Sequence, residues 1–179
     1  MMVRLVNILT ISRIFLAIII FILLSIGNNY FFALILFFLA GISDYFDGHL
    51  ARKYNATSQL AQILDPIADK ILIIFLLFGI AINLSSYLVG FVGAFIITRE
   101  IWVSALRDFN AQNGNMQATK VLYISKIKTS IQLFTIIIYL VALSFNKMLL
   151  IIIGDIFLII SLLITLYTGY IYTVSTFRK

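Results

Sequence analysis

Four aspartates in one short stretch are the residues whose types and spacing best suit chemistry. Asp44 and Asp47 stand three positions apart, and Asp65 and Asp69 stand four apart. Residues at these spacings share a helix face, so each pair would present two carboxylates in one direction. Four facing carboxylates repel one another unless they are neutralised, and their oxygens suit hard divalent cations. The spacing therefore predicts a site for two Mg²⁺ or Mn²⁺ ions.

Small and basic residues accompany the first pair of aspartates. Gly48 and Ala51 lie one and four positions beyond Asp47, which leaves room for a ligand or for a close neighbouring helix. Arg52 adds a planar guanidinium of the kind that binds phosphate. The surroundings of the carboxylates therefore favour a ligand that contains phosphate.

The elements that must position these residues are membrane helices. Of the 179 residues 63% are hydrophobic and only 11% are charged, with a mean hydropathy of +1.12, which excludes an ordinary soluble domain. Continuous apolar runs of about 20 residues or more suit helices that cross a bilayer, whereas a barrel would need alternation. The runs cover residues 5–26, 30–54, 59–84, 87–109, 119–145 and 147–174. We expect one all-α integral-membrane domain, residues 1–179, with six transmembrane helices around a polar cavity that faces the cytoplasm.

The basic residues set the expected orientation. With the N-terminus inside, Lys147 is the only one of the 13 lysines and arginines that falls outside, as the positive-inside rule requires. The net charge of +6 then describes a basic cytoplasmic rim that suits anionic lipids or phosphates, and we expect no nucleic-acid partner. Cysteine is absent, which excludes disulfides and thiol chemistry. We expect a multi-pass protein of the cell (inner) membrane with both termini and the active site in the cytoplasm.

The aspartates belong to a longer pattern, Asp-x-x-Asp-Gly-x-x-Ala-Arg, then eight residues, a small residue, three residues, Asp, three residues and Asp. This pattern resembles the signature of the CDP-alcohol phosphotransferases. The matching residues are Asp44, Asp47, Gly48, Ala51, Arg52, Asp65 and Asp69, with Ala61 where the family usually has glycine. The resemblance implies a transferase of phospholipid biosynthesis whose two divalent metals, held by the four aspartates, bind the diphosphate of a CDP-linked lipid. It further implies that Asp69 is the base that activates an alcohol, that CMP leaves, and that Gly48, Ala51, Arg52 and Ala61 lie beside the CDP-lipid.

Three further stretches bear on the acceptor alcohol. "NILTISR" at 7–13, "TREIWVSALRDF" at 98–109 and "SKIKTSIQ" at 125–132 resemble the branch of the family that joins CDP-diacylglycerol to glycerol 3-phosphate. The resemblance also implies a homodimer. An anionic acceptor needs cations near the metal site, and two arginines lie on one helical stripe ahead of two lysines that begin the next span. We predict that Arg107 and Lys126, supported by Arg99 and Lys128, bind the acceptor phosphate.

Some local readings stay open. Asp65 precedes Pro66, so it is either a helix N-cap or part of a helix that begins earlier and contains the proline. Asn7, Thr10 and Arg13 follow one another at three-residue spacing at the inner end of the first helix. Donor binding, helix capping and contacts between helices are equally compatible with that pattern.

Two other functions remain as alternatives. Within the same family the acceptor would be serine, inositol phosphate or phosphatidylglycerol. A different class, a divalent-cation transporter, also places carboxylates in a membrane. A transporter should distribute its charges through the bilayer, whereas here they lie almost entirely at one side. Asp155 lies toward the other side, and the sequence assigns no role to it.

Overall fold

The computed structural model describes residues 2–27, 29–54, 59–115 and 123–177. Within these ranges the side chains of residues 2–6, 47, 49–54, 59–62, 123 and 126 are not described. The described residues form helices and turns with no strand, which confirms the all-α prediction. The helices are α1 (Met2–Ser25), α2 (Tyr30–Tyr54), α3 (Gln59–Asn83), α4 (Tyr87–Gln112), α5 (Tyr123–Ser144) and α6 (Met148–Phe177).

The helices have the length and composition of an integral membrane protein. Within the described part of the chain, four apolar stretches are long enough to span a bilayer, namely Asn7–Ser25, Tyr87–Gln112, Ile127–Ser144 and Met148–Phe177. A shorter one, Tyr30–Phe46, covers the part of α2 that precedes and includes its first aspartate. Many large apolar side chains are exposed on the outside of the bundle, where lipid tails are their natural neighbours. The predicted class of an all-α integral membrane protein is confirmed.

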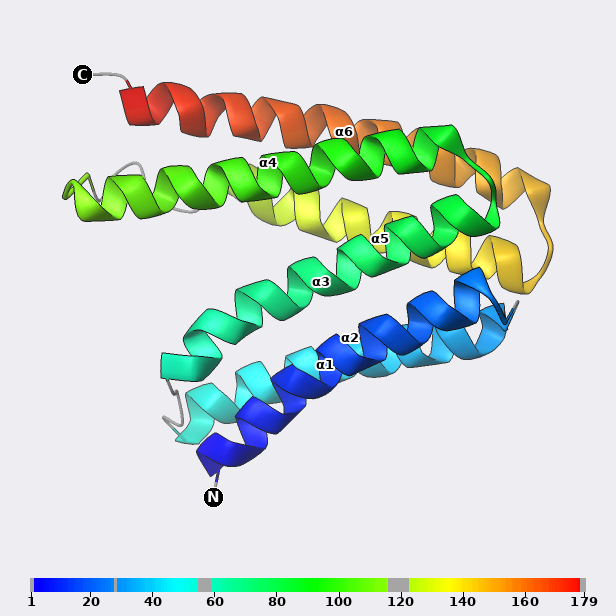
Figure 1. Cartoon of the computed structure of the whole chain (residues 1–179), viewed down its shortest axis with the longest axis horizontal. Helices are drawn as coiled ribbons and strands as arrows, with labels where there is room; N and C mark the ends of the chain where they lie inside the picture. The colour runs from blue at the N-terminus through cyan, green and yellow to red at the C-terminus, as the bar shows by residue number, and fades with distance from the viewer. Residues whose placement is uncertain (1, 28, 55–58, 116–122, 178–179) are drawn as a thin grey trace.

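The helices run back and forth so that both termini lie at one end of the bundle (Figure 1). α1 packs against α2 and α3, α5 packs against α6, and α4 contacts both α3 and α6. α3 and α4 are joined by a tight turn at one end and diverge toward the end that carries the termini (Figure 1). The first turns of α3 and the last turns of α4 therefore lie apart, at the end of the bundle that carries the termini.

The hydrophobic core lies mainly in the half of the bundle away from the termini. Its members recur every three or four residues, which places them on one face of each helix. They include Ala17, Ile20 and Leu24 of α1, Leu72, Leu76 and Ile80 of α3, and Ile136 and Leu140 of α5. At the outer turn, the side-chain amide of Asn83 donates to the carbonyl of Leu24 (3.0 Å) and to the hydroxyl of Tyr30 (2.9 Å). The half away from the termini is therefore mostly apolar, and its helices are joined by hydrogen bonds, whereas most of the polar groups lie in the half that carries the termini.

The buried face of α6 consists mainly of small and polar residues. It contains Gly154, Leu158, Ser161, Thr165, Thr168, Gly169 and Tyr172. Small residues allow membrane helices to approach closely, and hydroxyls hydrogen-bond across the contact. A Cβ added to Gly169 would lie 3.1 Å from Cγ of Arg99, so the glycine makes room for that arginine of α4. α6 therefore helps to set the position of a predicted site residue.

Candidate functional site

Three of the four predicted aspartates converge on one guanidinium. Nη1 of Arg13 contacts Oδ1 of Asp44 and lies 2.6 Å from Oδ1 of Asp69, and Nη2 lies 3.3 Å from Oδ1 of Asp65. The hydroxyl of Thr10 donates to the same oxygen of Asp65 at 2.6 Å. Arg13 is 1% exposed, while the three carboxylates are 41–54% exposed. α1, α2 and α3 thus meet in a carboxylate cluster around one cation.

Simple helical spacing produces this meeting point. Thr10 and Arg13 are three positions apart on α1, and Asp65 and Asp69 are four apart on α3, so each pair shares a face. Pro66 lies inside α3, which begins at Gln59. Of the two readings of Asp65, the structure therefore supports a helix that begins earlier, and Asp65 is not its N-cap.

Part of the predicted donor site lies outside the described side chains. This applies to Asp47, Ala51, Arg52 and Ala61, while Gly48 is half-buried on α2. Among the side chains that are described, no group of three or more acidic or histidine residues is arranged to hold a metal ion. The three described aspartates surround the guanidinium of Arg13 instead.

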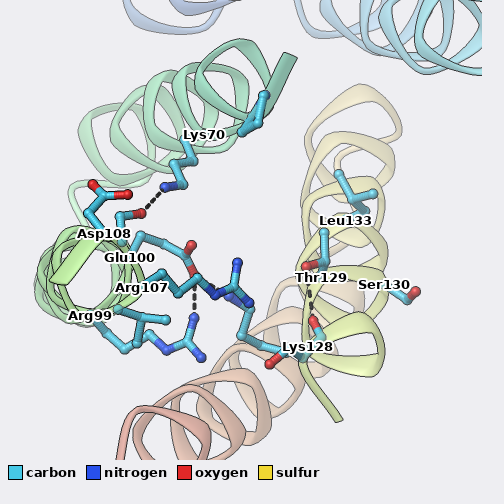
Figure 2. Close-up of a pocket in the computed structure, with 13 residues that line it drawn as sticks. Lys70, Arg99, Glu100, Arg107, Asp108, Lys128, Thr129, Ser130 and Leu133 are labelled. Atoms are coloured by element: carbon cyan, nitrogen blue, oxygen red, sulfur yellow. Dashed lines mark hydrogen bonds and ion pairs between the residues drawn. The ribbon is translucent and has the colours of Figure 1, made fainter. Parts of the chain in front are cut away.

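A second polar space of about 590 Å³ lies between α3, α4 and α5. Figure 2 shows its charged lining, with Lys70 on α3, Arg99, Glu100, Arg107 and Asp108 on α4, and Lys128 on α5. Four of these side chains are basic and two are acidic, so the lining carries an excess of two positive charges. That excess equals the charge of a phosphate monoester dianion. We call this space the basic cavity.

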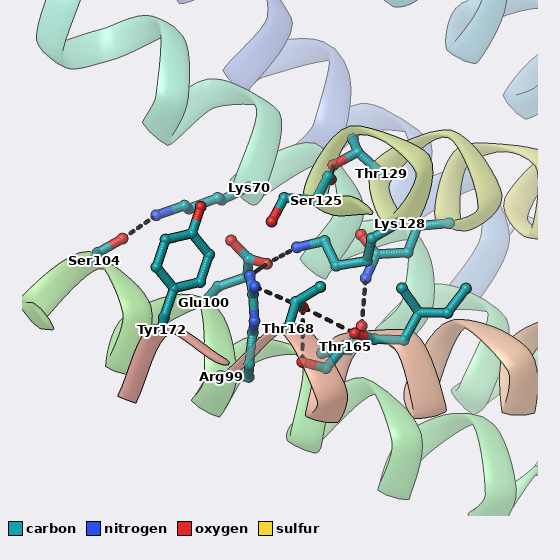
Figure 3. A network of polar contacts seen from close by, with 12 residues as sticks. Lys70, Arg99, Glu100, Ser104, Ser125, Lys128, Thr129, Thr165, Thr168 and Tyr172 are labelled. Carbon is teal, nitrogen blue, oxygen red and sulfur yellow. Dashed lines mark hydrogen bonds and ion pairs between the residues drawn. The ribbon is translucent and has the colours of Figure 1, made fainter. Parts of the chain in front are cut away.

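Glu100 holds two of the cations of the basic cavity in place (Figure 3). Its Oε1 lies 2.9 Å from Nη1 of Arg99 and also accepts from Nζ of Lys128. Arg99 donates through Nη2 to the hydroxyl of Thr168 at 2.8 Å, which connects α4 to α6. Arg99 is 7% exposed and Lys128 is 4% exposed. Buried cations require such partners, so Glu100 and Thr168 determine where these two charges point.

The other two cations are oriented by single hydroxyls. Nη2 of Arg107 donates to the hydroxyl of Tyr172 at 2.7 Å, and its guanidinium carbon lies 5.0 Å from the centre of the same ring. Nζ of Lys70 donates to the hydroxyl of Ser104 at 2.5 Å. These bonds fix the positions of the two cations, and neither uses a carboxylate as its acceptor.

Several donors in the lining have no hydrogen-bond partner among the described residues. They are Nε of Arg99, Nε of Arg107 and Oγ of Ser125. A buried donor without a partner costs about 1–3 kcal/mol, so such groups usually bind water or a ligand. Oxygen-rich anions can accept from all three. The donor set and the charge excess therefore both fit a phosphate group.

The basic cavity adjoins the carboxylate cluster. A smaller space of about 170 Å³ is lined by Asp69 and Lys70 of α3, Glu100 of α4 and Lys128 of α5. Asp69 and Lys70 are consecutive, so α3 turns one of them toward each polar site. This smaller space has Lys70, Glu100 and Lys128 in common with the basic cavity and Asp69 in common with the cluster, so it lies between the two sites, and we call it the passage.

An apolar groove of about 650 Å³ opens from the other side of the cluster. Arg13, Asp44 and Asp69 line its polar end. The remaining lining comes mostly from apolar residues of α2, α3 and α5, including Phe37, Phe38, Leu72, Ile73, Leu133 and Ile137. Hydrocarbon chains suit this surface, because their contacts with it are made of the same kind of atoms.

The structure brings some predicted site residues together and adds others. Arg99, Arg107 and Lys128 line one cavity, and the side chain of Lys126 lies outside the described part. Sequence reasoning missed Glu100, Ser104 and Asp108 as cavity residues. Their spacing of four places them on one stripe of α4, a signal that was available in the sequence. Asn7 and Thr10 lie on the α1 face of Arg13, and Thr10 binds Asp65.

Comparison with known proteins agrees with this arrangement. The model of the CDP-alcohol phosphatidyltransferase family matches residues 3–167. A protein of Wigglesworthia glossinidia brevipalpis is 41% identical over 113 residues, which are 63% of this chain and 62% of that protein. One of Blochmanniella floridana is 39% identical over 144 residues (79% and 74%), and one of Escherichia coli K12 is 37% identical over 103 residues (58% and 57%). All three are named CDP-diacylglycerol--glycerol-3-phosphate 3-phosphatidyltransferase.

These matches differ in how much of each relative they cover. The matched part spans about six tenths of the first relative and about three quarters of the second. The family match itself runs through α1 to α5 and into α6, and it contains both polar sites. The chain therefore belongs to the CDP-alcohol phosphatidyltransferase family.

Proposed function

We propose that this protein is a phosphatidylglycerophosphate synthase, which transfers the phosphatidyl group of CDP-diacylglycerol to glycerol 3-phosphate. The observation that carries the proposal is the basic cavity, whose excess of two positive charges suits a phosphorylated alcohol and which adjoins Asp69. The names of the curated relatives support the same donor and acceptor. The products are phosphatidylglycerol phosphate and CMP.

The proposed reaction is one displacement at phosphorus. The hydroxyl oxygen of glycerol 3-phosphate forms a bond to the phosphorus that carries diacylglycerol. The bond from that phosphorus to the oxygen of CMP breaks, and its electron pair leaves with CMP. The hydroxyl proton goes to the carboxylate of Asp69, which lines both the apolar groove and the passage to the basic cavity. That position supports Asp69 as the base, because a base must reach the acceptor hydroxyl.

The donor set of the cluster suits divalent metal ions, which this family generally uses. Three carboxylates from α2 and α3 already converge on one cationic group, so their oxygens are placed to share a positive charge. Asp44, Asp65 and Asp69, together with Asp47, would hold two Mg²⁺ or Mn²⁺ ions. When bound, such ions neutralise the diphosphate and polarise its phosphorus.

The remaining residues bind and orient the two substrates. Arg99, Arg107 and Lys128 bind the acceptor phosphate, with Lys126 as a further candidate, because their guanidinium and ammonium donors line the basic cavity. The acyl chains of the donor lie in the apolar groove, whose polar end meets the aspartates. Gly48, Ala51, Arg52 and Ala61 are the proposed neighbours of the CDP group, and Asn7 and Thr10 approach it from α1.

The proposal places this chemistry at the cytoplasmic face of a bacterial inner membrane, in a homodimer. Arg107 lies near the end of α4 and Lys128 near the start of α5, and both of these helix ends are on the side of the bundle that carries the termini (Figure 1). The positive-inside rule places such basic helix ends in the cytoplasm. A water-soluble acceptor would enter from that end, while the lipid donor would enter from the bilayer.

The deciding experiment is an assay of the purified protein in detergent micelles with CDP-diacylglycerol and Mg²⁺ or Mn²⁺. Glycerol 3-phosphate, serine and inositol phosphate are supplied separately, and release of CMP is followed. We expect metal-dependent release with glycerol 3-phosphate alone. Release with serine instead would overturn the acceptor assignment, and no metal-dependent release with any alcohol would favour a cation transporter.

A further inference from the structure

Arg13 neutralises part of the carboxylate cluster. It contributes one positive charge against the three negative charges of Asp44, Asp65 and Asp69. Carboxylates held this close repel one another, and a guanidinium buried in a membrane protein requires anionic partners. Each side of the contact therefore depends on the other.

The contact also occupies the space that a metal ion would need. The same atom, Nη1 of Arg13, contacts Oδ1 of Asp44 and lies 2.6 Å from Oδ1 of Asp69. Oxygen ligands of divalent ions lie about 2.0–2.6 Å from the metal, so a cation bound to both oxygens would overlap this nitrogen.

We propose that Arg13 is a resident counter-ion, whose guanidinium occupies the metal site until divalent cations displace it. Metal loading is then an exchange of one cation for another. Arg13 also lines the apolar groove beside Asp44, so the displaced side chain has a space into which it can turn. This inference rests on the divalent-metal part of the proposed function and is independent of the acceptor alcohol.

An exchange lowers the apparent affinity for metal, because the ion pairs of Arg13 must break first. Charge-assisted hydrogen bonds are stronger than neutral ones, and a tenfold change in affinity corresponds to about 1.4 kcal/mol. Arg13→Gln removes the charge and keeps an amide donor. We expect this variant to bind Mn²⁺ at least about tenfold more tightly than the unchanged protein.

The test measures Mn²⁺ binding to metal-stripped protein in micelles without any substrate, from the electron paramagnetic resonance signal of free Mn²⁺. Arg107→Gln is the matched control, because it removes an arginine from the basic cavity and should leave Mn²⁺ affinity unchanged. Equal or weaker binding by Arg13→Gln, with the control unchanged, would show that Arg13 supports the metal site and does not compete for it.

A second measurement uses the unchanged protein, in case Arg13→Gln does not fold without metal. Phenylglyoxal modifies accessible guanidinium groups, and peptide mass spectrometry reports its rate at Arg13. Arg13 is 1% exposed while it contacts the aspartates, so we expect faster modification of Arg13 in samples with bound Mn²⁺ and no change at Arg107. An unchanged or slower rate at Arg13 would overturn the exchange. Neither measurement needs catalysis, so both can be interpreted even if the protein does not catalyse the proposed reaction.

Discussion

Asp69 differs from the other described aspartates in the number of spaces that it borders. It contacts Arg13, lines the apolar groove and lines the passage toward the basic cavity. Asp65 instead accepts a hydrogen bond from Thr10. Asp44 lines the apolar groove but neither the passage nor the basic cavity. Position therefore separates carboxylates of the same type, and it favours Asp69 for contact with both substrates.

The base assignment predicts the kinetics of Asp69→Asn. The amide cannot accept the hydroxyl proton, so we expect kcat to fall by about 10²-fold or more, with a smaller change in KM for CDP-diacylglycerol. Steady-state assays of CMP release give both constants. Mn²⁺ binding to the same variant separates loss of the base from loss of a metal ligand. Full activity of Asp69→Asn would remove the base assignment.

The acceptor assignment predicts a selective effect of Arg107→Gln. Loss of a charged donor to phosphate should raise KM for glycerol 3-phosphate about tenfold and leave KM for CDP-diacylglycerol unchanged. Tyr172→Phe keeps the ring under Arg107 but removes the hydroxyl that it binds, so its effect on the same KM should be smaller. Lys147→Gln, at the opposite end of the bundle, is the charge control. An unchanged KM in Arg107→Gln would exclude it from the acceptor site.

At the scale of the helices, the sequence predicts where each helix begins and ends better than it predicts which side chains of different helices contact one another. The runs 30–54 and 59–84 correspond to Tyr30–Tyr54 and Gln59–Asn83, because continuous apolar composition and length define a membrane helix. The sequence does not indicate that Arg13 meets aspartates 31 to 56 positions away, because periodicity identifies a face and not the helix opposite it. The pairing of Glu100 on α4 with Lys128 on α5 could not be predicted for the same reason.

Glu100 connects α4 to α5, and its removal should destabilise that contact. In Glu100→Gln, Arg99 and Lys128 lose a shared carboxylate, and two buried cations face each other. Breaking a buried ion pair costs about 3–5 kcal/mol, so we expect a lower thermal unfolding midpoint in micelles. Glycerol 3-phosphate should raise the midpoint of this variant more than that of the unchanged protein, because its anion replaces the lost charge. Equal stabilisation of both proteins would place the anion elsewhere.

The contact between α5 and α6 depends on a glycine. A Cβ at Gly154 would lie 2.8 Å from Cε1 of Tyr139, whose hydroxyl donates to Asp155 at 2.6 Å. Gly154→Ala should therefore destabilise the protein by about 1–3 kcal/mol, seen as a lower unfolding midpoint. Gly41→Ala is the matched control, since nothing lies within 4 Å of its added Cβ. If the two variants unfold at the same midpoint, the close packing is not required. The hydrogen bond also gives Asp155 a structural partner, which the sequence did not suggest.

At the scale of the whole molecule, the two proposed substrates come from different phases, since CDP-diacylglycerol is a lipid of the bilayer and glycerol 3-phosphate is soluble in water. The apolar groove and the basic cavity meet around consecutive residues of α3, Asp69 and Lys70. The half of the described bundle away from the termini is mostly an apolar core, and its Asp155 accepts a hydrogen bond from Tyr139. This asymmetry favours transfer between a lipid and a soluble alcohol over transport of an ion.

The proposed reaction requires that the end of the bundle with the basic cavity faces the cytoplasm. This orientation can be measured with single introduced cysteines, because the sequence contains no cysteine. Tyr87 is 95% exposed at the start of α4 and Gln112 is exposed at its end, so Tyr87→Cys and Gln112→Cys mark the two ends of one helix. We expect a membrane-impermeant maleimide to label Tyr87→Cys in intact cells, and Gln112→Cys only after permeabilisation, because basic inner ends stay in the cytoplasm. The unchanged protein gives the background. The reverse labelling would place the basic cavity outside the cell, away from a cytoplasmic supply of phosphorylated acceptor, and would contradict the proposed topology.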